Sequence, residues 1–402
     1  MRDLLLSQLK EYQEKFDTMD AELELCVKDP ALGVEGFVVV WNTAICQGGV
    51  FAQNGRLGCG KGGTRVMQGT SLEGVKRLAK NMALKNAAAG LPLGGAKSGV
   101  NIDPNDPSYE TKYRRFVKLV QEEGVLYEDG GIFGGFGYDI GGRPPLNAIW
   151  ACDELKSTKS FTGKPVDMGG TDYDKQGIAG YGVAVAARTA LACKGYDIAQ
   201  ASFAVQGVGA MGAAVLHYFS EFGAKLKAFS DPRYGGLWRF KTYASDKSIQ
   251  ALFTQDEKAV KACLEDEADF ISDDNSTALY ESVDVVFPCA LEDTITLDNV
   301  ERVIAPFVVE GANNPTRPEA KERLFELDRF LVPDVLANPG GIIAAFVEMT
   351  VQEGDKVVAA KKETEERITK NVEHMISLVR EHGVRPEQAA LYMIYKNIFK
   401  QD

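Results

Sequence analysis

A glycine-rich turn between an apolar strand and a helix is the feature that most constrains the fold. Gln206-Gly-Val-Gly-Ala-Met-Gly212 follows the apolar run Phe203-Ala-Val205 and opens a helical stretch. In this pattern Gly207 permits the tight turn, Gly209 lets the backbone approach a pyrophosphate, and Gly212 lets the helix pack against the strand. The amino end of the helix offers N–H donors and partial positive charge to phosphates. The segment therefore predicts dinucleotide binding, with a turn kept for packing as the alternative.

The next apolar run supplies a carboxylate where a ribose-binding residue is expected. Leu226–Phe229 is followed by Ser230 and Asp231, and Asp231 lies nineteen residues after Gly212. A carboxylate there accepts the ribose hydroxyls and repels a 2′-phosphate, which favours NAD. Arg233 could pair with that phosphate instead, so NADP is not excluded. Val208 and Met211, which stand between the glycines, are expected to contact the coenzyme.

Short apolar runs alternate with helical stretches throughout the region after residue 202. The runs are Phe203–Val205, Leu226–Phe229, Val283–Phe287, Phe307–Val309 and Phe330–Val332. Such alternation is typical of βαβ units and a parallel sheet. The chain has 402 residues, which is long for one domain and comfortable for two. We therefore expect an α/β protein whose domain boundary lies near residue 190, followed by a charged helical segment over 355–401.

The first part of the chain is expected to combine helices, a strand and glycine-rich loops. Residues 1–29 have apolar positions near helical spacing, and residues 36–41 form a β-rich run. Ser71 precedes an amphipathic stretch to Asn86, which predicts a helix with Ser71 as its N-cap. Glycines cluster at 48–63, 90–99 and 130–142, beside polar or charged residues.

Composition excludes several function classes. Lys and Arg total 45 against 57 Asp and Glu, a net charge of −12, which argues against nucleic acid or an anionic membrane as partner. Residues 1–20 lack the apolar core of a signal peptide, and no apolar run is long enough to cross a membrane. Seven cysteines are scattered without CxxC spacing, which favours reduced thiols and a cytoplasmic location. Three histidines leave little material for a metal site or a Ser-His-Asp triad, so no metal is expected.

Lysines set among glycines are the candidate chemical groups. Lys85 and Lys97 lie around Gly90, Gly94, Gly95 and Gly99, and Lys61 opens Lys61-Gly-Gly-Thr-Arg65. Lysines held close together in an apolar cleft have a lowered pKa, and such a lysine can act as a base near neutral pH. Asp139, in a further glycine loop, is the fourth candidate. The alternatives are solvated lysines and an Asx-turn aspartate.

The motifs, taken in order, resemble the glutamate/leucine/phenylalanine/valine dehydrogenase superfamily. Leu91–Pro104 fits the active-site signature of that superfamily, and four further segments match it in order over roughly residues 35–350. These segments are Lys61–Arg65, the stretch 203–231, Glu310–Thr316 and Ala337–Gly341. The resemblance implies an N-terminal substrate-binding and oligomerisation domain (1–190), a Rossmann NAD(P)-binding domain (191–345) with a cleft between the two, and C-terminal helices (346–402) that pack back towards the first domain.

The resemblance also implies an activity and roles for individual residues. The reaction is the reversible oxidative deamination of an L-amino acid to a 2-oxo acid, ammonia and reduced coenzyme. Lys97 matches the catalytic lysine that activates the attacking water, and Asp139 the aspartate that shuttles protons at the amino nitrogen. Lys85 matches the lysine that holds the α-carboxylate. The superfamily is generally hexameric or octameric, so a homo-oligomer is expected.

The identity of the amino acid is left open between two branches of the superfamily. Lys61 matches the lysine that pairs with the side-chain carboxylate in glutamate-specific members, and Gly62 follows it in the same motif. Ala345, however, stands where those members carry a serine, and residues 86–90 look more like the leucine and phenylalanine branch. An unpaired buried lysine is costly, which favours glutamate. Among the remaining matched residues, Asn313 and Asn338 are assigned to coenzyme binding.

Departures from the superfamily pattern keep two further hypotheses open. The glycine-rich stretch 169–182 is one residue longer than usual, and Ala179 replaces a common threonine. A catalytically weakened nucleotide-binding regulator on the same fold is therefore a second hypothesis. A hydroxy-acid dehydrogenase is a third, although such enzymes usually rely on a histidine, and none of the three here lies in the first domain or in a glycine-rich loop.

Overall fold

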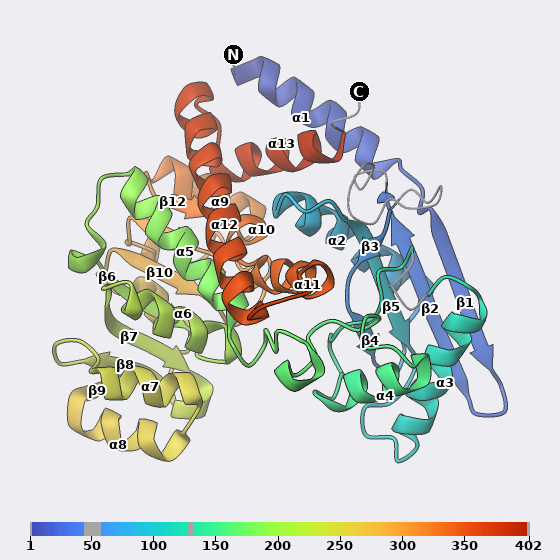
Figure 1. Cartoon of the computed structure of the whole chain (residues 1–402). Helices are drawn as coiled ribbons and strands as arrows, with labels where there is room; N and C mark the ends of the chain where they lie inside the picture. The colour runs from blue at the N-terminus through green and yellow to red at the C-terminus, as the bar shows by residue number, and fades with distance from the viewer. Residues whose placement is uncertain (1, 44–57, 127–131, 400–402) are drawn as a thin grey trace. The chain divides into compact units, whose positions relative to one another are not determined.

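The computed structural model describes residues 2–43, 58–126 and 132–399, and it divides into two compact units (Figure 1). The five-strand unit comprises Ser7–Gln176, Ile342–Ala360 and Tyr392–Asp402. The seven-strand unit comprises Met1–Leu6, Gly177–Gly341 and Lys361–Leu391. The domain limits predicted from the sequence, at residues 190 and 345, stay predictions.

The sheet of the five-strand unit has β5 at its centre. In the order β1-β2-β5-β3, β1 and β2 pair antiparallel, as do β2 and β5, whereas β3 and β4 both pair parallel with β5. Lys97 of β5 lies opposite Val39 of β2. The strands are β1 (Leu23–Asp29), β2 (Val34–Trp41), β3 (Gly60–Lys61), β4 (Thr64–Val66) and β5 (Gly94–Val100).

The α2 helix (Leu72–Ala88) lies directly on β5 because the strand presents glycine to it. A Cβ added to Gly95 would stand 2.2 Å from the Ala79 carbonyl oxygen, so no larger residue fits between helix and strand. Ser71 caps the helix by accepting a hydrogen bond from the Gly74 N–H, as predicted. The other helices that include residues of this unit are α1 (Arg2–Asp17), α3 (Tyr109–Glu122), α4 (Leu146–Leu155), α11 (Gly340–Thr350), the start of α12 (Lys356–His382) and the end of α13 (Pro386–Ile398).

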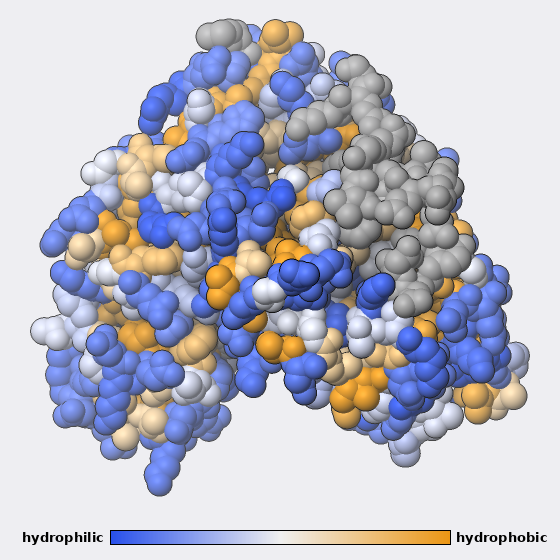
Figure 2. Space-filling model, viewed as in Figure 1, coloured by the Kyte–Doolittle hydropathy of each residue, from blue (hydrophilic) through white to orange (hydrophobic). Residues whose placement is uncertain are grey.

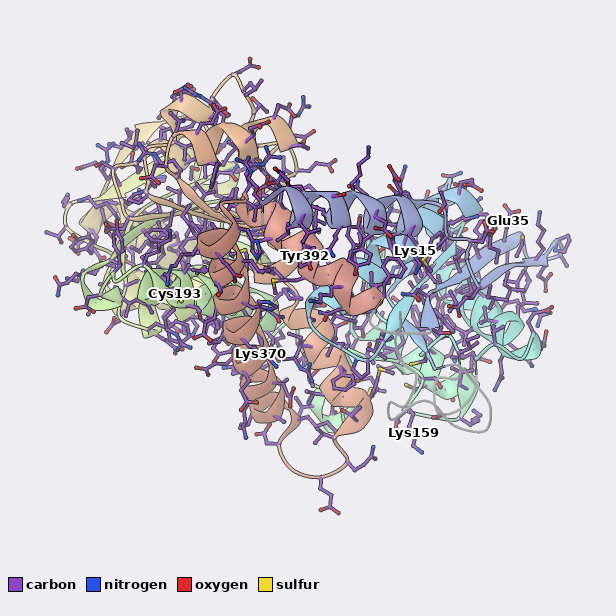
Figure 3. All side chains as sticks on the ribbon, turned by 90° about the horizontal axis from the view of Figure 1, so that it is seen from above. Lys15, Glu35, Lys159, Cys193, Lys370 and Tyr392 are labelled. Carbon is purple, nitrogen blue, oxygen red and sulfur yellow. The ribbon has the colours of Figure 1, made fainter. Side chains whose placement is uncertain are left out.

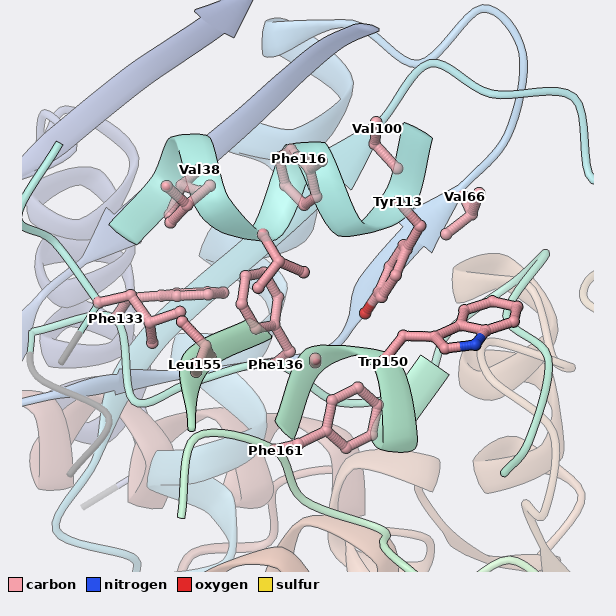
Figure 4. Packing of buried hydrophobic residues seen from close by; sticks show 14 of the residues in the cluster. Val38, Val66, Val100, Tyr113, Phe116, Phe133, Phe136, Trp150, Leu155 and Phe161 are labelled. Carbon is pink, nitrogen blue, oxygen red and sulfur yellow. The ribbon is translucent and has the colours of Figure 1, made fainter. Parts of the chain in front are cut away.

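Aromatic and aliphatic side chains fill the opposite face of this sheet. Phe116 and Tyr113 of α3 pack against Phe136, Phe161 and valines of the strands (Figure 4). The rings of Phe116 and Phe136 meet edge to face at 5.9 Å, a favoured geometry for aromatic pairs. This cluster anchors the segment around residue 136, which matters for the site described below.

The seven-strand unit is built on a largely parallel sheet in the order β12-β11-β10-β6-β7-β8-β9. Strands β12 to β7 of that order pair parallel, and β8 and β9 extend the sheet antiparallel. The strands are β6 (Ser202–Gln206), β7 (Lys225–Asp231), β8 (Gly236–Phe240), β9 (Ala268–Ser272), β10 (Val285–Pro288), β11 (Phe307–Val309) and β12 (Phe330–Val332).

The helices between and after these strands are α5 (Ile178–Cys193), α6 (Ala210–Glu221), α7 (Asp246–Thr254), α8 (Glu257–Glu267), α9 (Pro318–Glu326) and α10 (Asp334–Ala337). Most of α12 and the start of α13 also belong to this unit. The face of α12 turned towards the viewer is mostly hydrophilic (Figure 2). The end of α13 lies beside α1, where the Tyr392 hydroxyl is 3.2 Å from Gln8 Oε1 (Figure 3).

Most elements predicted from hydrophobic pattern are confirmed, including the five parallel strands and the helix that follows Ser71. Two predictions are wrong in part. The first helix ends at Asp17 and residues 23–29 form β1, because Leu23, Leu25 and Val27 alternate with polar residues at the two-residue period of a strand. The last helical segment is two helices, broken at Gly383, whose φ of +64° is left-handed.

Two findings concern expectations drawn from composition. Among the described residues, no helix is long and apolar enough to span a membrane. Six cysteines are free thiols, namely Cys26, Cys59, Cys152, Cys193, Cys263 and Cys289. The seventh, Cys46, lies outside the described residues.

Candidate active site and coenzyme site

Residues 136–140 run beside β4 and place Asp139 next to the sheet. The Thr64 N–H donates to the Gly137 carbonyl at 2.9 Å, and Thr64 and Tyr138 form a parallel bridge. The close approach needs glycine, because a Cβ on Gly63 would stand 2.3 Å from the Tyr138 carbonyl oxygen. The segment therefore continues the sheet beyond β4 for a few residues.

The register of this arrangement brings three charged side chains to one face. Arg65 pairs with Gly99 of β5, and Lys97 lies two residues before Gly99, on the same face of that strand. Asp139 follows Tyr138 and so stands beside Arg65. The Asp139 Oδ2 atom is 3.0 Å from Lys97 Nζ and 3.1 Å from Arg65 Nε. The structure thus brings Lys97 and Asp139 together, although 42 residues separate them in the sequence.

The electrostatics of this centre follow from its burial. Lys97 is 6% exposed, and desolvation lowers the pKa of its ammonium group, while the carboxylate of Asp139 opposes that change. Burial raises the pKa of the Asp139 carboxyl, whereas the positive charges of Lys97 and Arg65 lower it. The two cations have the larger effect, so the pKa lies below its ordinary value. The site therefore pairs an anionic carboxylate with a lysine made more ready to release its proton.

Lys61 is more deeply buried than Lys97 and is bonded to backbone. Its side chain, on β3, is 1% exposed. The Nζ atom donates to the carbonyl oxygens of Phe136 at 2.7 Å and Gly135 at 3.1 Å, with Gly62 at 3.5 Å. Burial lowers the pKa of Lys61 to about 7, against the opposing charge of Glu348. The solvated reading is thus wrong for both Lys61 and Lys97.

The other predicted substrate-binding residues lie in the same unit. Lys85 stands in the last turn of α2, and Ala345 is buried on α11. Gly62 is tightly enclosed, because a Cβ there would fall 1.8 Å from the Ala96 carbonyl oxygen.

Two charged residues that the sequence analysis did not single out, Glu348 and Arg65, belong to this region. Arg65 closes the Lys61–Arg65 motif, and that position was the available signal. Glu348 is the one charged residue of the apolar α11 sequence GGIIAAFVEMT, and it is bonded to Lys164. A lone carboxylate in an apolar helix is rare without a buried partner, and this was the signal for Glu348.

In the seven-strand unit the predicted glycine loop lies at the topological switch point of the sheet. Strand β6 has β7 on one side and β10 on the other, and ligands of such sheets bind outside the carboxyl ends of the strands at this point. Gly207 has a φ of +82°, and a Cβ there would meet the Ala290 Cβ at 2.6 Å. Gly212 packs so closely that its Cβ would stand 1.9 Å from the Gly207 carbonyl oxygen.

Gly209 differs from these two glycines. A Cβ added to it would meet no atom within 4 Å, so the fold itself does not require glycine there. A pyrophosphate that approaches the protein backbone closely would require glycine at this position. Gly209 also precedes the first turn of α6, which contains Met211 and whose N–H groups can bind phosphates. The open space at Gly209 fits a bound pyrophosphate.

Asp231 ends β7 and holds the glycine loop. Its Oδ2 atom accepts a hydrogen bond from the Val208 N–H at 2.9 Å. Its Oδ1 atom accepts from Arg233, at 2.9 Å from the backbone N–H and 3.1 Å from Nε. The guanidinium of Arg233 also donates to the Val208 carbonyl at 2.6 Å. The carboxylate of Asp231 and the guanidinium of Arg233 thus form a hydrogen-bonded pair at the edge of the loop.

Buried acceptors remain open around the carboxyl ends of these strands. Gln206 Oε1 and Asn338 Oδ1 are buried and accept no hydrogen bond within the described part of the chain. The amide of Asn338 donates to the Gly311 carbonyl at 3.1 Å and to Asn313 Oδ1 at 3.2 Å, which brings the two predicted asparagines together. Orphaned buried acceptors beside a glycine loop fit the polar groups of a dinucleotide.

The two units together define a class of protein. One holds a dinucleotide-type sheet with its glycine loop, and the other holds a buried lysine–aspartate pair suited to acid–base chemistry. Within the described ranges, no group of three or more His, Cys, Asp and Glu side chains is arranged to hold a metal ion. These features are those of a nicotinamide-dependent dehydrogenase.

Comparison with known families makes the assignment specific. Residues 169–400 match the Glutamate/Leucine/Phenylalanine/Valine dehydrogenase family, and residues 40–128 match the Glu/Leu/Phe/Val dehydrogenase dimerisation domain. The chain belongs to this family, and it is an amino-acid dehydrogenase. The resemblance predicted from the motifs is confirmed, and the hydroxy-acid hypothesis is wrong.

Curated relatives cover most of the chain. It is 36% identical over 307 residues to the NADP(+)-dependent glutamate dehydrogenase of Pyrobaculum calidifontis, covering 73% of this chain and 70% of that one. It is 35% identical to the glutamate dehydrogenase of Thermotoga maritima, covering 72% and 69%. It is 27% identical to the NAD-specific glutamate dehydrogenase of Clostridioides difficile, covering 98% and 96%.

Solved structures share the fold. Glutamate dehydrogenase from Peptoniphilus asaccharolyticus has a TM-score of 0.74 at 22% identity, over 98% of this chain and 97% of that one. Glutamate dehydrogenase 2 from Plasmodium falciparum has a TM-score of 0.80 at 19% identity, over 98% and 91%. L-tryptophan dehydrogenase from Nostoc punctiforme has a TM-score of 0.68 at 19% identity, over 96% and 98%. The predicted two-domain α/β fold is confirmed.

Proposed function

We propose that the protein catalyses the reversible oxidative deamination of L-glutamate to a 2-oxo acid and ammonia, with NAD or NADP. The observation that carries the chemistry is the 3.0 Å pairing of Lys97 with Asp139 in a buried site. The glutamate dehydrogenases among its relatives, together with Lys61, support glutamate as the amino acid.

The side chains of the five-strand unit can perform the proton transfers of this reaction. Lys97, with its lowered pKa, acts as the base that takes a proton from the attacking water. Asp139 exchanges a proton with the amino nitrogen, and Arg65 keeps its carboxylate charged. Lys85 holds the α-carboxylate and so fixes the substrate in register. The nicotinamide coenzyme, when bound, supplies the hydride acceptor.

An apolar amino acid of the leucine, valine or phenylalanine type is the second candidate substrate. The Lys61 ammonium group already donates to the Phe136 and Gly135 carbonyls. Ala345 brings no hydroxyl that could bind a second carboxylate. These two observations favour an uncharged side chain, whereas the ammonium charge of Lys61 favours an anionic one.

A panel assay separates the candidates. The purified protein is mixed with NAD or NADP and each of a set of L-amino acids, and reduced coenzyme is followed by absorbance. We expect turnover with glutamate, and we expect Lys61→Leu to lower kcat/KM for glutamate at least tenfold more than that for leucine. Equal losses on both would contradict the glutamate assignment and favour the apolar one.

The same panel tests the regulator hypothesis suggested by Ala179. Measurable coenzyme binding without turnover of any amino acid would favour a weakened enzyme that binds nucleotide as a regulator. A cytoplasmic location and a homo-oligomeric state, hexamer or octamer, stay predictions, and sedimentation of the purified protein tests the second.

A further inference from the structure

Glu348 is a buried carboxylate that the proposed proton transfers do not use. It lies on α11, one helical turn after Ala345, and its side chain is 1% exposed. Burying an anion among apolar residues is costly unless hydrogen bonds and a counter-charge compensate. Its contacts therefore indicate what this carboxylate holds in place.

The carboxylate of Glu348 contacts one short segment of the chain. Oε2 accepts hydrogen bonds from the Gly163 N–H, the Thr171 N–H and the Thr171 hydroxyl, each at 3.0 Å. Oε1 forms an ion pair with Lys164 Nζ, which also donates to the Phe161 carbonyl. The segment 161–171 is thereby tied to α11 through a single side chain.

The same segment supports the backbone that presents Asp139. The Phe136 N–H donates to the Ser160 carbonyl at 2.8 Å, and the Thr162 N–H donates to the Phe136 carbonyl at 3.0 Å. The rings of Tyr138 and Phe161 meet edge to face at 4.9 Å. Residues 136–139 are thus held between β4 on one side and residues 160–162 on the other.

We propose that Glu348 is a positioning residue of the dehydrogenase: through Gly163, Lys164 and Thr171 it joins α11 to the backbone that presents Asp139. This inference rests on the proposed role of Asp139. Glu348 does not touch the reacting atoms. It fixes the distance between the helix that carries Ala345 and the segment that carries the acid–base carboxylate.

The charge of Glu348 adds a second effect on the same pocket. Lys61 faces Glu348 and Cys59, which favour its protonated form, and Lys164 and Lys97, which disfavour it. Removing the carboxylate leaves the ammonium group of Lys164 buried without its counter-charge. A neutral variant therefore disturbs both the geometry and the balance of charge around Lys61.

Glu348→Gln and Thr171→Val test the proposal, and Thr171→Ser is the conservative control. Gln keeps the size of Glu348 but removes its charge, and Val removes one donor while keeping the Thr171 N–H. For Glu348→Gln we expect kcat to fall about tenfold or more, KM for the amino acid to rise several-fold, and KM for the coenzyme to stay within twofold. Thr171→Val should show the same pattern more weakly, and Thr171→Ser should restore wild-type values.

A matched ion pair elsewhere supplies the negative control. Glu365 bonds Arg188 at 2.6 Å and the Tyr181 hydroxyl at 2.9 Å, in the seven-strand unit. Glu365→Gln should leave kcat and both KM values within twofold. A merely structural role of Glu348 would reduce the active fraction, which lowers apparent kcat but leaves KM for the amino acid unchanged. That outcome overturns the proposal.

Hydrogen–deuterium exchange gives a readout that does not depend on turnover. In Thr171→Val and Glu348→Gln, exchange should rise in residues 136–140 and 160–171 and stay unchanged in β6 and β7. Unchanged exchange at 136–140 overturns the link to Asp139, even if the wild-type protein turns over no amino acid. Wild-type inactivity by itself contradicts the proposed function, so the two failures are distinguishable.

Discussion

Lys97 Nζ and Asp139 Oδ2 lie 3.0 Å apart, on the face of the sheet that α2 covers. Gly95 and Gly99 flank Lys97 at the two-residue period of β5, and a Cβ at Gly99 would stand 2.7 Å from Thr70 Cγ2. The strand is therefore glycine-rich because α2 and its N-terminal turn cover that face closely. The same glycines leave the lysine as the one long side chain of that face of β5.

Substitution of either partner should remove catalysis while leaving the coenzyme site intact. We expect Lys97→Met and Asp139→Asn each to lower kcat on the order of 10²–10⁴-fold, because a positioned acid or base contributes about that much. Steady-state kinetics measure kcat, and fluorescence titration measures coenzyme affinity, which should change less than twofold.

The control for that prediction is a second lysine–aspartate pair, to which no chemical role is assigned. Lys112 and Asp106 lie 2.6 Å apart in the same unit. Asp106→Asn should leave kcat within twofold of wild type. If Lys97→Met retains more than a tenth of wild-type kcat, Lys97 is not the base.

Burial of Lys61 should make stability depend on pH. In the unfolded chain a lysine keeps its proton up to about pH 10.4. In the folded protein the pKa of Lys61 is about 7, so between these values the unfolded state binds one more proton. The free energy of unfolding therefore rises with pH in this window, by roughly 1.4 kcal/mol per unit. Below pH 7 both states are protonated and the full cost of burying the charge remains.

The measurement compares wild type with Lys61→Met by urea denaturation. Between pH 7.5 and pH 9.5 the free energy of unfolding of wild type should rise by about 2 kcal/mol relative to Lys61→Met. Lys10→Met, at an exposed position of α1, should show no such difference. A difference that stays constant over this range would mean that Lys61 keeps its charge when folded.

The glycine loop gives a prediction in which two similar substitutions affect different properties, namely stability and coenzyme affinity. Gly212→Ala places a Cβ 1.9 Å from the Gly207 carbonyl oxygen and should destabilise the protein by about 2–4 kcal/mol. Gly209→Ala meets no atom within 4 Å and should leave the melting temperature within 1–2 °C, yet lower coenzyme affinity about tenfold or more. Thermal melts measure the stability of each variant, and coenzyme titrations measure its affinity. Unchanged coenzyme affinity in Gly209→Ala would place the pyrophosphate elsewhere.

Local patterns were sufficient to predict the glycine loop, the strands around it and the helix capped by Ser71. Each of these depends on residues close together in the sequence, such as the spacing from Gly212 to Asp231. The antiparallel strands β8 and β9 were missed, because the one local signal near them is Gly235-Gly236, with φ of +84° and +137°, at the turn between β7 and β8. A pair of glycines marks a turn without revealing the strands on either side.

The candidate site was predicted by residue type but not by arrangement. The sequence indicated that Lys61 and Lys97 are unusual, yet it could not show that the Lys61 ammonium group meets carbonyls of Gly135 and Phe136, more than seventy residues away. Arg65 and Glu348 were missed for the same reason. Their partners come from the 136–140 and 161–171 segments, whose positions depend on tertiary packing and on no sequence period.

The coenzyme preference depends on the balance between Asp231 and Arg233. The carboxylate of Asp231 repels a 2′-phosphate, but the Arg233 guanidinium lies 3.1 Å from it and offsets part of that charge. We expect wild type to prefer NAD, and Asp231→Asn to shift the ratio of kcat/KM values towards NADP by about tenfold, which corresponds to about 1.4 kcal/mol. Arg233→Gln should shift the ratio the other way, because it removes the cation that a phosphate would meet. Steady-state kinetics with both coenzymes at matched concentrations measure the ratio. Asp197→Asn is the control, because Asp197 lies in the same unit and its side chain caps a turn by accepting a hydrogen bond from the Ala199 N–H. A wild-type preference for NADP that Asp231→Asn leaves unchanged would show that the ribose does not meet this carboxylate.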